Sequence, residues 1–427
     1  MAWRLGMVEG RGVSGGTGIV ILGAGQGGLQ VATSLRDDGY RGAIRLVGEE
    51  PGLPYQRPPL SKAYLAGKVH EGGLDLRTED FFREREIELL APERALRIDR
   101  GTRTVGLASG AVLSYDRLVL ATGSRNRLLT VPGATLDGVF YLRLRTEADL
   151  IRARLAQARR IVVVGAGFIG LEFASLAASL GIEVTVVEAA SRPMARSLSV
   201  PMSDYLRQAH EAAGLRFLFE TAVTGVTGEG GRASGVVTAD GAHLPADLVL
   251  VGIGVVPNVE LAAEAGLAVE NGIRVDEYLA TGDEAISAIG DCASYPSAFA
   301  GGRRIRLESV QNAVDQARCL AARLAGRPAA YDAVPWFWSD QGRMKLQIAG
   351  LTAGHDEAVP RGDPGRGAFS VFCYGGGRLL GVESVNRPAD HMIARRLMAR
   401  GLGVTPAEAA DLGLDLKARA HALLEGG

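Results

Sequence analysis

The sequence has few cysteines, and no two of them are close together. Its 427 residues contain three cysteines, which are Cys292, Cys319 and Cys373. Neither a CxxC nor a CxxxxC motif is present, so a dithiol redox centre and a thiolate metal site both lack the spacing they need. We therefore expect no metal, and an odd number of dispersed thiols favours a reducing, cytoplasmic setting.

Strong net charge and long apolar runs are absent as well. The formal net charge is −1, so the overall charge does not indicate a nucleic-acid partner. The apolar runs in GIVILGAG and RIVVVGAG are far shorter than the roughly 18 residues of a membrane span. The tail DLGLDLKARAHALLEGG is short and mixed, so we expect no membrane anchor. Residues 1–17 lack a hydrophobic signal core and are expected to be a disordered leader.

Glycine, by contrast, is abundant, with 58 residues. Two segments, 18–50 and 160–190, share one design. Each starts with a β-branched run, crosses a glycine loop, continues with helical apolar spacing and ends in a second apolar strand. Each segment therefore predicts a βαβ unit, and their repetition predicts two nucleotide-binding domains.

The composition changes near the C-terminus. After the linker at 325–335, two of the three tryptophans occur together in PWFWSDQ, and the strand-like stretches LQIAGL and AFSVFCY follow. We predict an α/β protein with two Rossmann-like dinucleotide-binding domains and a C-terminal α+β domain. The predicted boundaries are 18–124 together with 247–329 for a discontinuous first domain, 125–246 for the second and 330–427 for the third.

Both glycine loops have the spacing of a dinucleotide-binding turn. The motif glycines are Gly23, Gly25 and Gly28 in GAGQGG, and Gly165, Gly167 and Gly170 in GAGFIG. In such a turn the first glycine permits the tight bend, the second admits a pyrophosphate and the third lets helix pack on strand. Free N–H groups at the helix N-terminus then meet the phosphate charge.

An acid follows each loop at the end of the next predicted strand. Glu49 lies 21 residues after Gly28, and Glu188 lies 18 residues after Gly170. Both spacings are near the approximately 20 residues expected for a ribose-binding carboxylate. Two packing loops with incidental acids are the alternative, and the repeated pattern favours two bound dinucleotides.

The acid of the second loop also bears on cofactor choice. A carboxylate at Glu188 accepts hydrogen bonds from a ribose 2′-hydroxyl and repels a 2′-phosphate, which favours NADH over NADPH. Arg192 and Arg196 follow closely in EAASRPMAR, and either arginine offers a charge that a 2′-phosphate would use.

The chain resembles the glutathione-reductase-like FAD/NAD(P) flavoproteins. The resemblance rests on the two dinucleotide units, on LVLATG (118–123), on AISAIGD (285–291) and on the third domain. Five further motifs are similar to the NADH-dependent ferredoxin reductases of bacterial oxygenase and P450 systems, of the putidaredoxin reductase and palustrisredoxin reductase type. These motifs are PYQRPPLSKAYL, YLR (141–143), GAGFIGLE, RLESVQNA and PWFWSDQ, and the resemblance spans residues 18–418.

This resemblance implies FAD in the first domain and NADH in the second. It implies that Lys62 of PPLSK lies near the flavin and pairs with Glu172 of GFIGLE, and that both residues are catalytic. Each has a simpler alternative. Lys62 would be a solvated lysine in the first turn of a helix, and Glu172 would favour a helix N-terminus by about 0.3–1 kcal/mol.

The loops and the resemblance together define the expected cofactor contacts. For FAD these are Gly23, Gly25, Gly27, Gly28, Glu49, Arg57, Pro58, Lys62, Ala95, Ala121, Thr122, Gly123, Arg143, Asp291, Val310 and Trp338. For NADH they are Gly165, Gly167, Phe168, Ile169, Gly170, Glu172, Glu188 and Gly254. The alternatives are a turn-forming role for Asp291, and core packing for Phe168 and for Trp338 with its neighbour Trp336.

The resemblance implies an acidic [2Fe-2S] ferredoxin as electron acceptor, and through it a P450 or another oxygenase. Such encounters are transient and steered by charge. Candidate contacts are Arg77, Arg318 and Lys345, with Arg343 nearby, and ordinary surface charge is the alternative for each. A monomer would suit this role.

Three other functions compete with this prediction. A disulfide reductase would need a CxxxxC near residues 50–65, where the chain has PYQRPPLSKAYL. A membrane-associated NADH:quinone oxidoreductase would need the anchor that the tail does not provide. The third alternative is a redox-responsive interaction protein similar to apoptosis-inducing factor, which shares the fold and part of the motif set.

Overall fold

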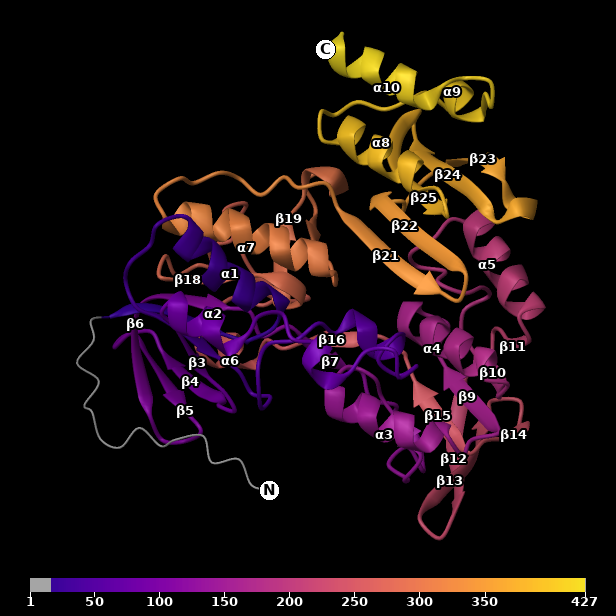
Figure 1. Cartoon of the computed structure of the whole chain (residues 1–427), viewed down its shortest axis with the longest axis horizontal. Coiled ribbons are helices and arrows are strands. Elements are labelled where there is room, and N and C mark those ends of the chain that lie inside the picture. The colour runs from indigo at the N-terminus through magenta and orange to yellow at the C-terminus, as the bar shows by residue number, and fades with distance from the viewer. Residues whose placement is uncertain (1–16, 427) are drawn as a thin grey trace.

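The computed structural model describes residues 17–426, so the leader expected at 1–17 lies outside the described residues except for Thr17. Three units built on separate sheets follow one another around the molecule (Figure 1). Strands from two separate segments of the chain form the first unit. The second lies beside it, and the C-terminal unit, orange to yellow in Figure 1, packs against the second.

The first unit has a seven-stranded sheet in the order β3-β2-β1-β6-β5-β4, with β18 also paired to β6. The strands β3, β2, β1, β6 and β18 run parallel, and β4 and β5 extend the sheet antiparallel. The strands are β1 (Gly18–Leu22), β2 (Ile44–Val47), β3 (Ile87–Leu90), β4 (Ala95–Asp99), β5 (Thr104–Leu107), β6 (Val112–Leu120) and β18 (Ile286–Ala288). The helices are α1 (Gln26–Asp37), α2 (Glu79–Glu84), α6 (Glu260–Glu264) and α7 (Val310–Leu324).

The second unit has a five-stranded parallel sheet in the order β11-β10-β9-β15-β8. Its strands are β8 (Val139–Phe140), β9 (Arg160–Val164), β10 (Glu183–Val187), β11 (Leu215–Leu218) and β15 (Leu248–Val251), and its helices are α3 (Arg145–Leu155), α4 (Phe168–Ser179) and α5 (Val200–Ala212). A small antiparallel sheet of β12 (Val223–Glu229), β13 (Arg232–Thr238) and β14 (His243–Pro245) covers one side. Both predicted βαβ units are present.

Strand β15 corrects one predicted boundary. It pairs with β9 and β8 of the second sheet, although the sequence predicts residues 247–329 as part of the first domain. The apolar run LVLV fits the interior of either sheet equally well, so composition did not distinguish them. The chain returns to the first unit only after β16 (Val255–Pro257), which pairs antiparallel with β7 (Ser124–Asn126). We therefore propose that these two short strands mark the crossing between the first two domains.

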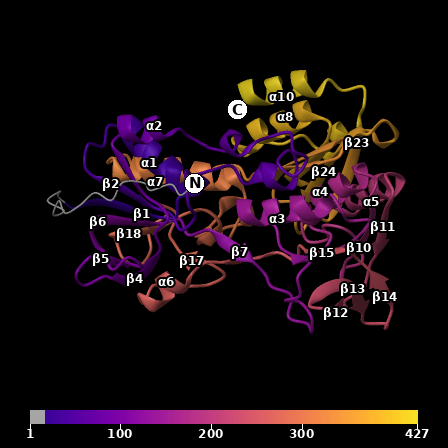
Figure 2. The same ribbon diagram turned by 60° about the horizontal axis from the view of Figure 1, so that its bottom comes forward.

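The third unit is a five-stranded antiparallel sheet in the order β21-β22-β25-β24-β23. Its strands are β21 (Trp336–Gln341), β22 (Met344–Gly350), β23 (Glu357–Asp363), β24 (Ala368–Gly375) and β25 (Arg378–Val385), followed by α8 (Pro388–Met398), α9 (Pro406–Ala410) and α10 (Leu416–Glu425). Helices α8 and α10 lie on the side of the sheet away from the second unit, as the two views together show (Figures 1 and 2).

A single buried cluster joins parts of all three units. It contains Leu60 from the segment after β2, Leu171 from α4 and Leu346 from β22, all of them at most 2% exposed. Burial of apolar surface at about 25 cal/mol per Å² therefore holds the units together where they meet. Helix α4 and strand β21 lie against each other at this point. The polar residues described below lie in this shared region.

Candidate active site where the three units meet

The first glycine loop has an open helix N-terminus. Helix α1 begins after Gly25, which provides no side-chain cap, and the first turn carries no acid. A Cβ atom added at Gly25 would meet nothing within 4 Å, whereas one at Gly28 would overlap the carbonyl oxygen of Gly23. The third glycine is therefore required for packing, and the second borders open space. Unsatisfied N–H groups beside open space fit a pyrophosphate.

The second loop repeats this arrangement. Helix α4 begins after Gly167 without a side-chain cap or an acid in its first turn. A Cβ atom at Gly170 would overlap the carbonyl oxygen of Gly165, whereas one at Gly167 would have only a single neighbour, at 3.8 Å. Both predicted loops therefore fit a dinucleotide, and the residues of each loop lie where the motif requires them.

The two acids that follow the loops differ in their contacts. Glu188 accepts hydrogen bonds from the backbone N–H of Ala166 at 2.7 Å and of Ala190 at 2.8 Å. Glu49 is exposed, and its carboxylate is 3.6 Å from the guanidinium of Arg94. Both carboxylates lie at the carboxyl end of the strand after their loop, as expected for a ribose contact.

The predicted contact between Lys62 and Glu172 is present. The Lys62 Nζ is 2.9 Å from Glu172 Oε1, and Glu172 is only 7% exposed. Lys62 closes the short helix Pro58–Ser61 instead of opening a helix, and its side chain is largely covered. Glu172 is the fifth residue of α4, beyond the first turn. Both simpler alternatives, a solvated lysine and a helix-terminal acid, are therefore wrong.

Two buried serines that the sequence prediction missed also hold Glu172. Ser61 donates to Glu172 Oε2, and Ser339 donates to Oε1 at 2.7 Å. A second acid, Asp340, lies 3.9 Å from Lys62 Nζ. These residues stand inside PPLSK and PWFWSDQ, so the motifs identified the right segments. A serine in a motif does not indicate which residue it will contact, and both serines are far from Glu172 in the sequence, so the contacts could not be predicted.

Arg57, Arg143 and Asp291 form a second polar group where the first and second units meet. Arg57 donates to the carbonyl oxygen of Arg143 at 2.9 Å and pairs with Glu50. Arg143 lies 3.5 Å from Asp291, which also accepts from Ser124 at 2.8 Å. Burial lowers the pKa of Arg143, and the charge of Asp291 opposes this shift. Asp291 thus links Ser124 of β7 to Arg143 of the second unit, which is more than a turn-forming role requires.

The other predicted cofactor residues lie at the ends of strands and helices. Ala95 starts β4, residues 121–123 follow β6, Val310 is the first residue of α7, and Gly254 precedes β16. Gly27 is packed closely against α7, because an added Cβ would lie 3.5 Å from that of Ala313. Ile169 is 41% exposed beside the second loop. Their assignment to FAD or NADH stays a prediction.

A row of aromatic rings leads from the second loop into the third unit. The ring of Phe168 is 4.5 Å from that of Phe337, and Phe337 is followed by Trp338 at 6.4 Å. Trp336 lies 6.1 Å from Trp338 and carries the guanidinium of Arg395 over its ring at 4.2 Å. These side chains are half-buried, so core packing and a cofactor contact are compatible at Phe168 and Trp338.

The candidate basic contacts are all exposed. Arg77 lies over the ring of Phe81 at 5.2 Å, and Arg318 is 3.6 Å from Asp315 on α7. Lys345 lies on β22, next to the hairpin turn that contains Arg343. They come from separate elements of the first and third units, and their role stays a prediction.

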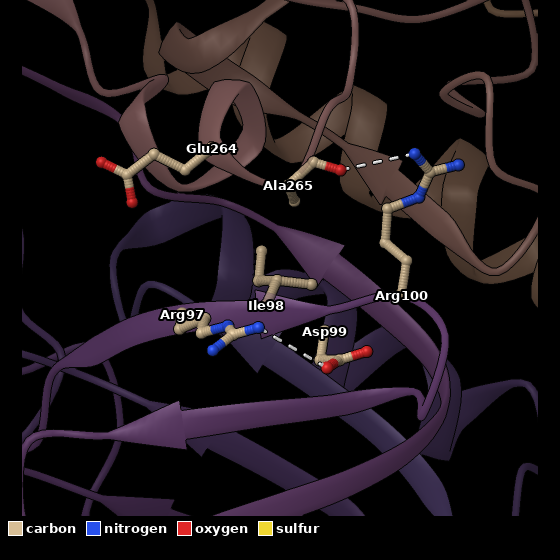
Figure 3. Close-up of a pocket in the computed structure, with 6 residues that line it drawn as sticks. All are labelled: Arg97, Ile98, Asp99, Arg100, Glu264 and Ala265. Carbon is tan, nitrogen blue, oxygen red and sulfur yellow. Dashed lines mark hydrogen bonds and ion pairs between the residues drawn. The ribbon is translucent and has the colours of Figure 1, made fainter.

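A cavity of about 460 Å³ lies elsewhere, between β4 and α6 (Figure 3). Its lining consists of Arg97, Ile98, Asp99, Arg100, Glu264 and Ala265. The guanidinium of Arg97 faces Asp99, and that of Arg100 is bound by Asp283. Because both cations have partners and neither glycine loop reaches it, the cavity does not belong to the site. Among residues 17–426 no cluster of three or more His, Cys, Asp or Glu could hold a metal ion, and no helix there could cross a membrane.

Comparison with known proteins supports the same organisation. Residues 17–317 match the family model described as pyridine nucleotide-disulphide oxidoreductase, and residues 336–420 match one described as reductase C-terminal. Rhodocoxin reductase of Rhodococcus erythropolis is 55% identical over 399 residues, 93% of each chain. Putidaredoxin reductase of Pseudomonas putida is 41% identical over 404 residues, 93% of this chain and 96% of that protein.

Solved structures of similar reductases have the same fold as this chain. The ferredoxin reductase of the CYP199A2 system from Rhodopseudomonas palustris superposes with a TM-score of 0.93 at 52% identity, covering 95% of this chain and 100% of that one. The reductase in a covalent putidaredoxin reductase–putidaredoxin complex gives a TM-score of 0.92 at 40% identity, covering 97% and 99%. The predicted fold class and resemblance are therefore confirmed, and this chain belongs to the pyridine nucleotide-disulphide oxidoreductase family of FAD- and NAD(P)-binding flavoproteins.

Proposed function

We propose that this protein is an FAD-dependent NADH:ferredoxin reductase. The observation that carries the proposal is the buried Lys62–Glu172 pair, with 2.9 Å between Lys62 Nζ and Glu172 Oε1, where the three units meet. It stands between two dinucleotide loops, and no cysteine pair accompanies it. The relatives of similar length carry names of ferredoxin-type reductases.

Each part of the site has a distinct task. When bound, FAD supplies the chemistry that neither substrate can perform alone, since it accepts a hydride and gives up electrons singly. The loop with Gly25 binds its pyrophosphate, and the loop with Gly167 binds that of NADH. Lys62 offers a cation where negative charge develops, and Glu172 orients this ammonium. Burial of Glu172 keeps water from competing for the ion pair.

The contacts of the second loop favour NADH over NADPH. The Glu188 carboxylate, held by two backbone N–H groups, is fixed at the end of β10. Arg192 donates to the carbonyl oxygens of Leu198 and Ala195, both at 2.9 Å. Its guanidinium is therefore already engaged, and of these two arginines Arg196 is the exposed one that a 2′-phosphate could meet. A rigid carboxylate beside an engaged arginine disfavours the additional phosphate.

The electron acceptor that we propose is a [2Fe-2S] ferredoxin serving a P450 or another oxygenase. The putidaredoxin reductase to which this chain is similar was solved in a covalent complex with putidaredoxin. Arg77, Arg318 and Lys345 are proposed contacts, because exposed cations steer an acidic partner into a transient encounter. A monomeric state and a cytoplasmic location are part of the same proposal.

Anaerobic spectroscopy tests this function directly. The purified protein should carry flavin absorbance that bleaches with one equivalent of NADH and returns when oxidised [2Fe-2S] ferredoxin is added. A protein similar to apoptosis-inducing factor would instead stay reduced for a long time and turn over slowly with ferredoxin. Absence of flavin, or a flavin spectrum that NADH leaves unchanged, would disprove the proposal.

A further inference from the structure

The hydrogen bonds around Glu172 continue beyond the ion pair through the third unit and back to the second unit. Ser339 donates to Glu172 Oε1 at 2.7 Å, and Gln341 Nε2 donates to Ser339 Oγ at 3.1 Å. The other end of the amide, Gln341 Oε1, is 2.7 Å from His210 Nε2. Four side chains therefore form one line from the ion pair to helix α5.

This line is completely enclosed and crosses between units twice. Ser339 and Gln341 are 0% exposed, and His210 is 1% exposed. Ser339 and Gln341 are two residues apart on β21, so both point to the same face of the strand, toward α4. His210 follows Met202 and Leu206 at intervals of four on the buried face of α5. The third unit thus provides the middle of the line and the second unit both ends.

The hydrogen-bond chemistry gives the line a single direction. A carboxylate only accepts, so Ser339 must donate to Glu172 and accept from Gln341. The amide oxygen of Gln341 then faces His210, which must donate through Nε2–H. His210 Nδ1 has no hydrogen-bond partner among the described residues, as expected for the bare nitrogen of that tautomer. Burial lowers the pKa of His210, which keeps the ring neutral, and the bond to Gln341 opposes the shift.

We propose that His210, Gln341 and Ser339 are positioning residues that hold the Glu172 carboxylate in place for Lys62. Each donor in the line points toward the carboxylate, so the bonds polarise one another in the same sense. The strand β21 belongs to the third unit, and docking of that unit onto the second therefore completes the ion-pair site. The inference rests on the proposed function, because the role of the Lys62–Glu172 pair in NADH oxidation is part of that function.

Matched substitutions at His210 test the line. In His210→Gln the amide provides an N–H donor at a similar reach, whereas His210→Phe fills the space without a donor. Gln341→Leu breaks the line at its centre. We expect His210→Phe and Gln341→Leu to slow stopped-flow reduction of the bound flavin by NADH by about tenfold, and His210→Gln to stay within about threefold of wild type.

Thr352→Val provides the control for damage to the interface alone. Thr352 is 4% exposed in the third unit and donates to the carbonyl oxygen of Ser197 in the second, outside the line. This variant should lower the melting temperature as much as Gln341→Leu does, while leaving the reduction rate unchanged. Equal slowing in Thr352→Val and Gln341→Leu, or equal rates in His210→Phe and wild type, would overturn the proposal.

The tautomer of His210 gives a readout that does not depend on activity. Histidine-selective ¹⁵N NMR of the holoprotein at pH 7 should show one of the six histidines as a neutral Nε2–H ring whose signal is lost in His210→Gln. Glu172→Gln should shift that signal through the line. A protonated or Nδ1–H ring at His210 would refute the inference even if NADH reduction proceeds normally. If NADH does not reduce the wild-type flavin at all, the proposed function is disproved, whereas the NMR result still tests the hydrogen-bonded line. The two failures can therefore be distinguished.

Discussion

The two glycine loops, residues 23–28 and 165–170, have nearly the same backbone and different surroundings. In each, a Cβ at the third motif glycine would overlap the carbonyl oxygen of the first, and the helix after the loop has no side-chain cap. The difference appears seven residues after the first glycine, where the first loop has Gln30 and the second has Glu172. Gln30 donates to Ser34 within its own helix, whereas Glu172 contacts residues from both other units.

The comparison separates binding from reactivity. In the proposed function the glycines shape a turn that receives a pyrophosphate, and this requirement is the same in both loops. A residue seven positions after the first motif glycine lies just beyond the first turn of the helix, and its side chain faces the elements that pack on that helix. After the second loop this residue is Glu172, which faces Lys62, and its helix α4 packs against β21. We therefore propose that the same local sequence design becomes a reactive site only where the three units meet.

Substitution of the second motif glycine should have the largest effect and should separate the two cofactors. Gly25→Ala places a methyl group in open space, so the chain should fold but should lose most of its bound FAD, because the methyl group occupies the approach of the pyrophosphate. Gly167→Ala should retain FAD and lose its response to NADH. The measurements are the flavin absorbance of the purified protein and the dissociation constant of NADH.

A glycine outside both loops controls for the substitution itself. Gly72→Ala also meets nothing within 4 Å and lies in the short helix Glu71–Gly73, so flavin content and NADH binding should be unchanged. If Gly25→Ala kept a full complement of FAD, the first loop would not receive the pyrophosphate, and the likeness between the loops would be one of packing alone.

Substitution of Glu172, seven residues after the first glycine of the second loop, should give the next largest effect. Glu172→Ala removes the partner that orients Lys62, and we expect flavin reduction by NADH to slow by about a hundredfold, with FAD still bound. Lys62→Ala should behave similarly. Gln30→Ala, the matched change in the first loop, should leave the rate unaltered because its bond stays within α1. Stopped-flow absorbance measures all three, and wild-type rates in both site variants would reduce the pair to a structural role.

Features that depend on neighbouring residues could be predicted from the sequence. The loops, the strands on either side of them and the acids at Glu49 and Glu188 follow from local spacing, and the structure contains each one. The Lys62–Glu172 contact was also expected, although only from a family resemblance. Spacing alone says nothing about residues that are 110 positions apart.

Contacts made by ordinary residues could not be predicted. Ser61, Ser339, Gln341 and His210 are common residue types, and their significance arises from partners in other units. Strand β15 was assigned to the wrong unit for a related reason. An apolar run indicates burial in a parallel sheet, but pairing with β9 instead of β6 is decided by the path of the chain.

Substitution of the acids that follow the two loops, Glu188 and Glu49, should give the smallest difference in activity. Glu188→Ala removes the charge that repels a 2′-phosphate and releases the N–H groups of Ala166 and Ala190, so the ratio of kcat/KM for NADH to that for NADPH should fall by about tenfold, equivalent to roughly 1.4 kcal/mol. Glu49→Ala should leave this ratio unchanged and weaken only FAD. Steady-state kinetics with both nucleotides measures the ratio. An unchanged ratio in Glu188→Ala would mean that the carboxylate only holds the loop through the N–H groups of Ala166 and Ala190, and the exposed Arg196 would then be the next residue to test for cofactor choice.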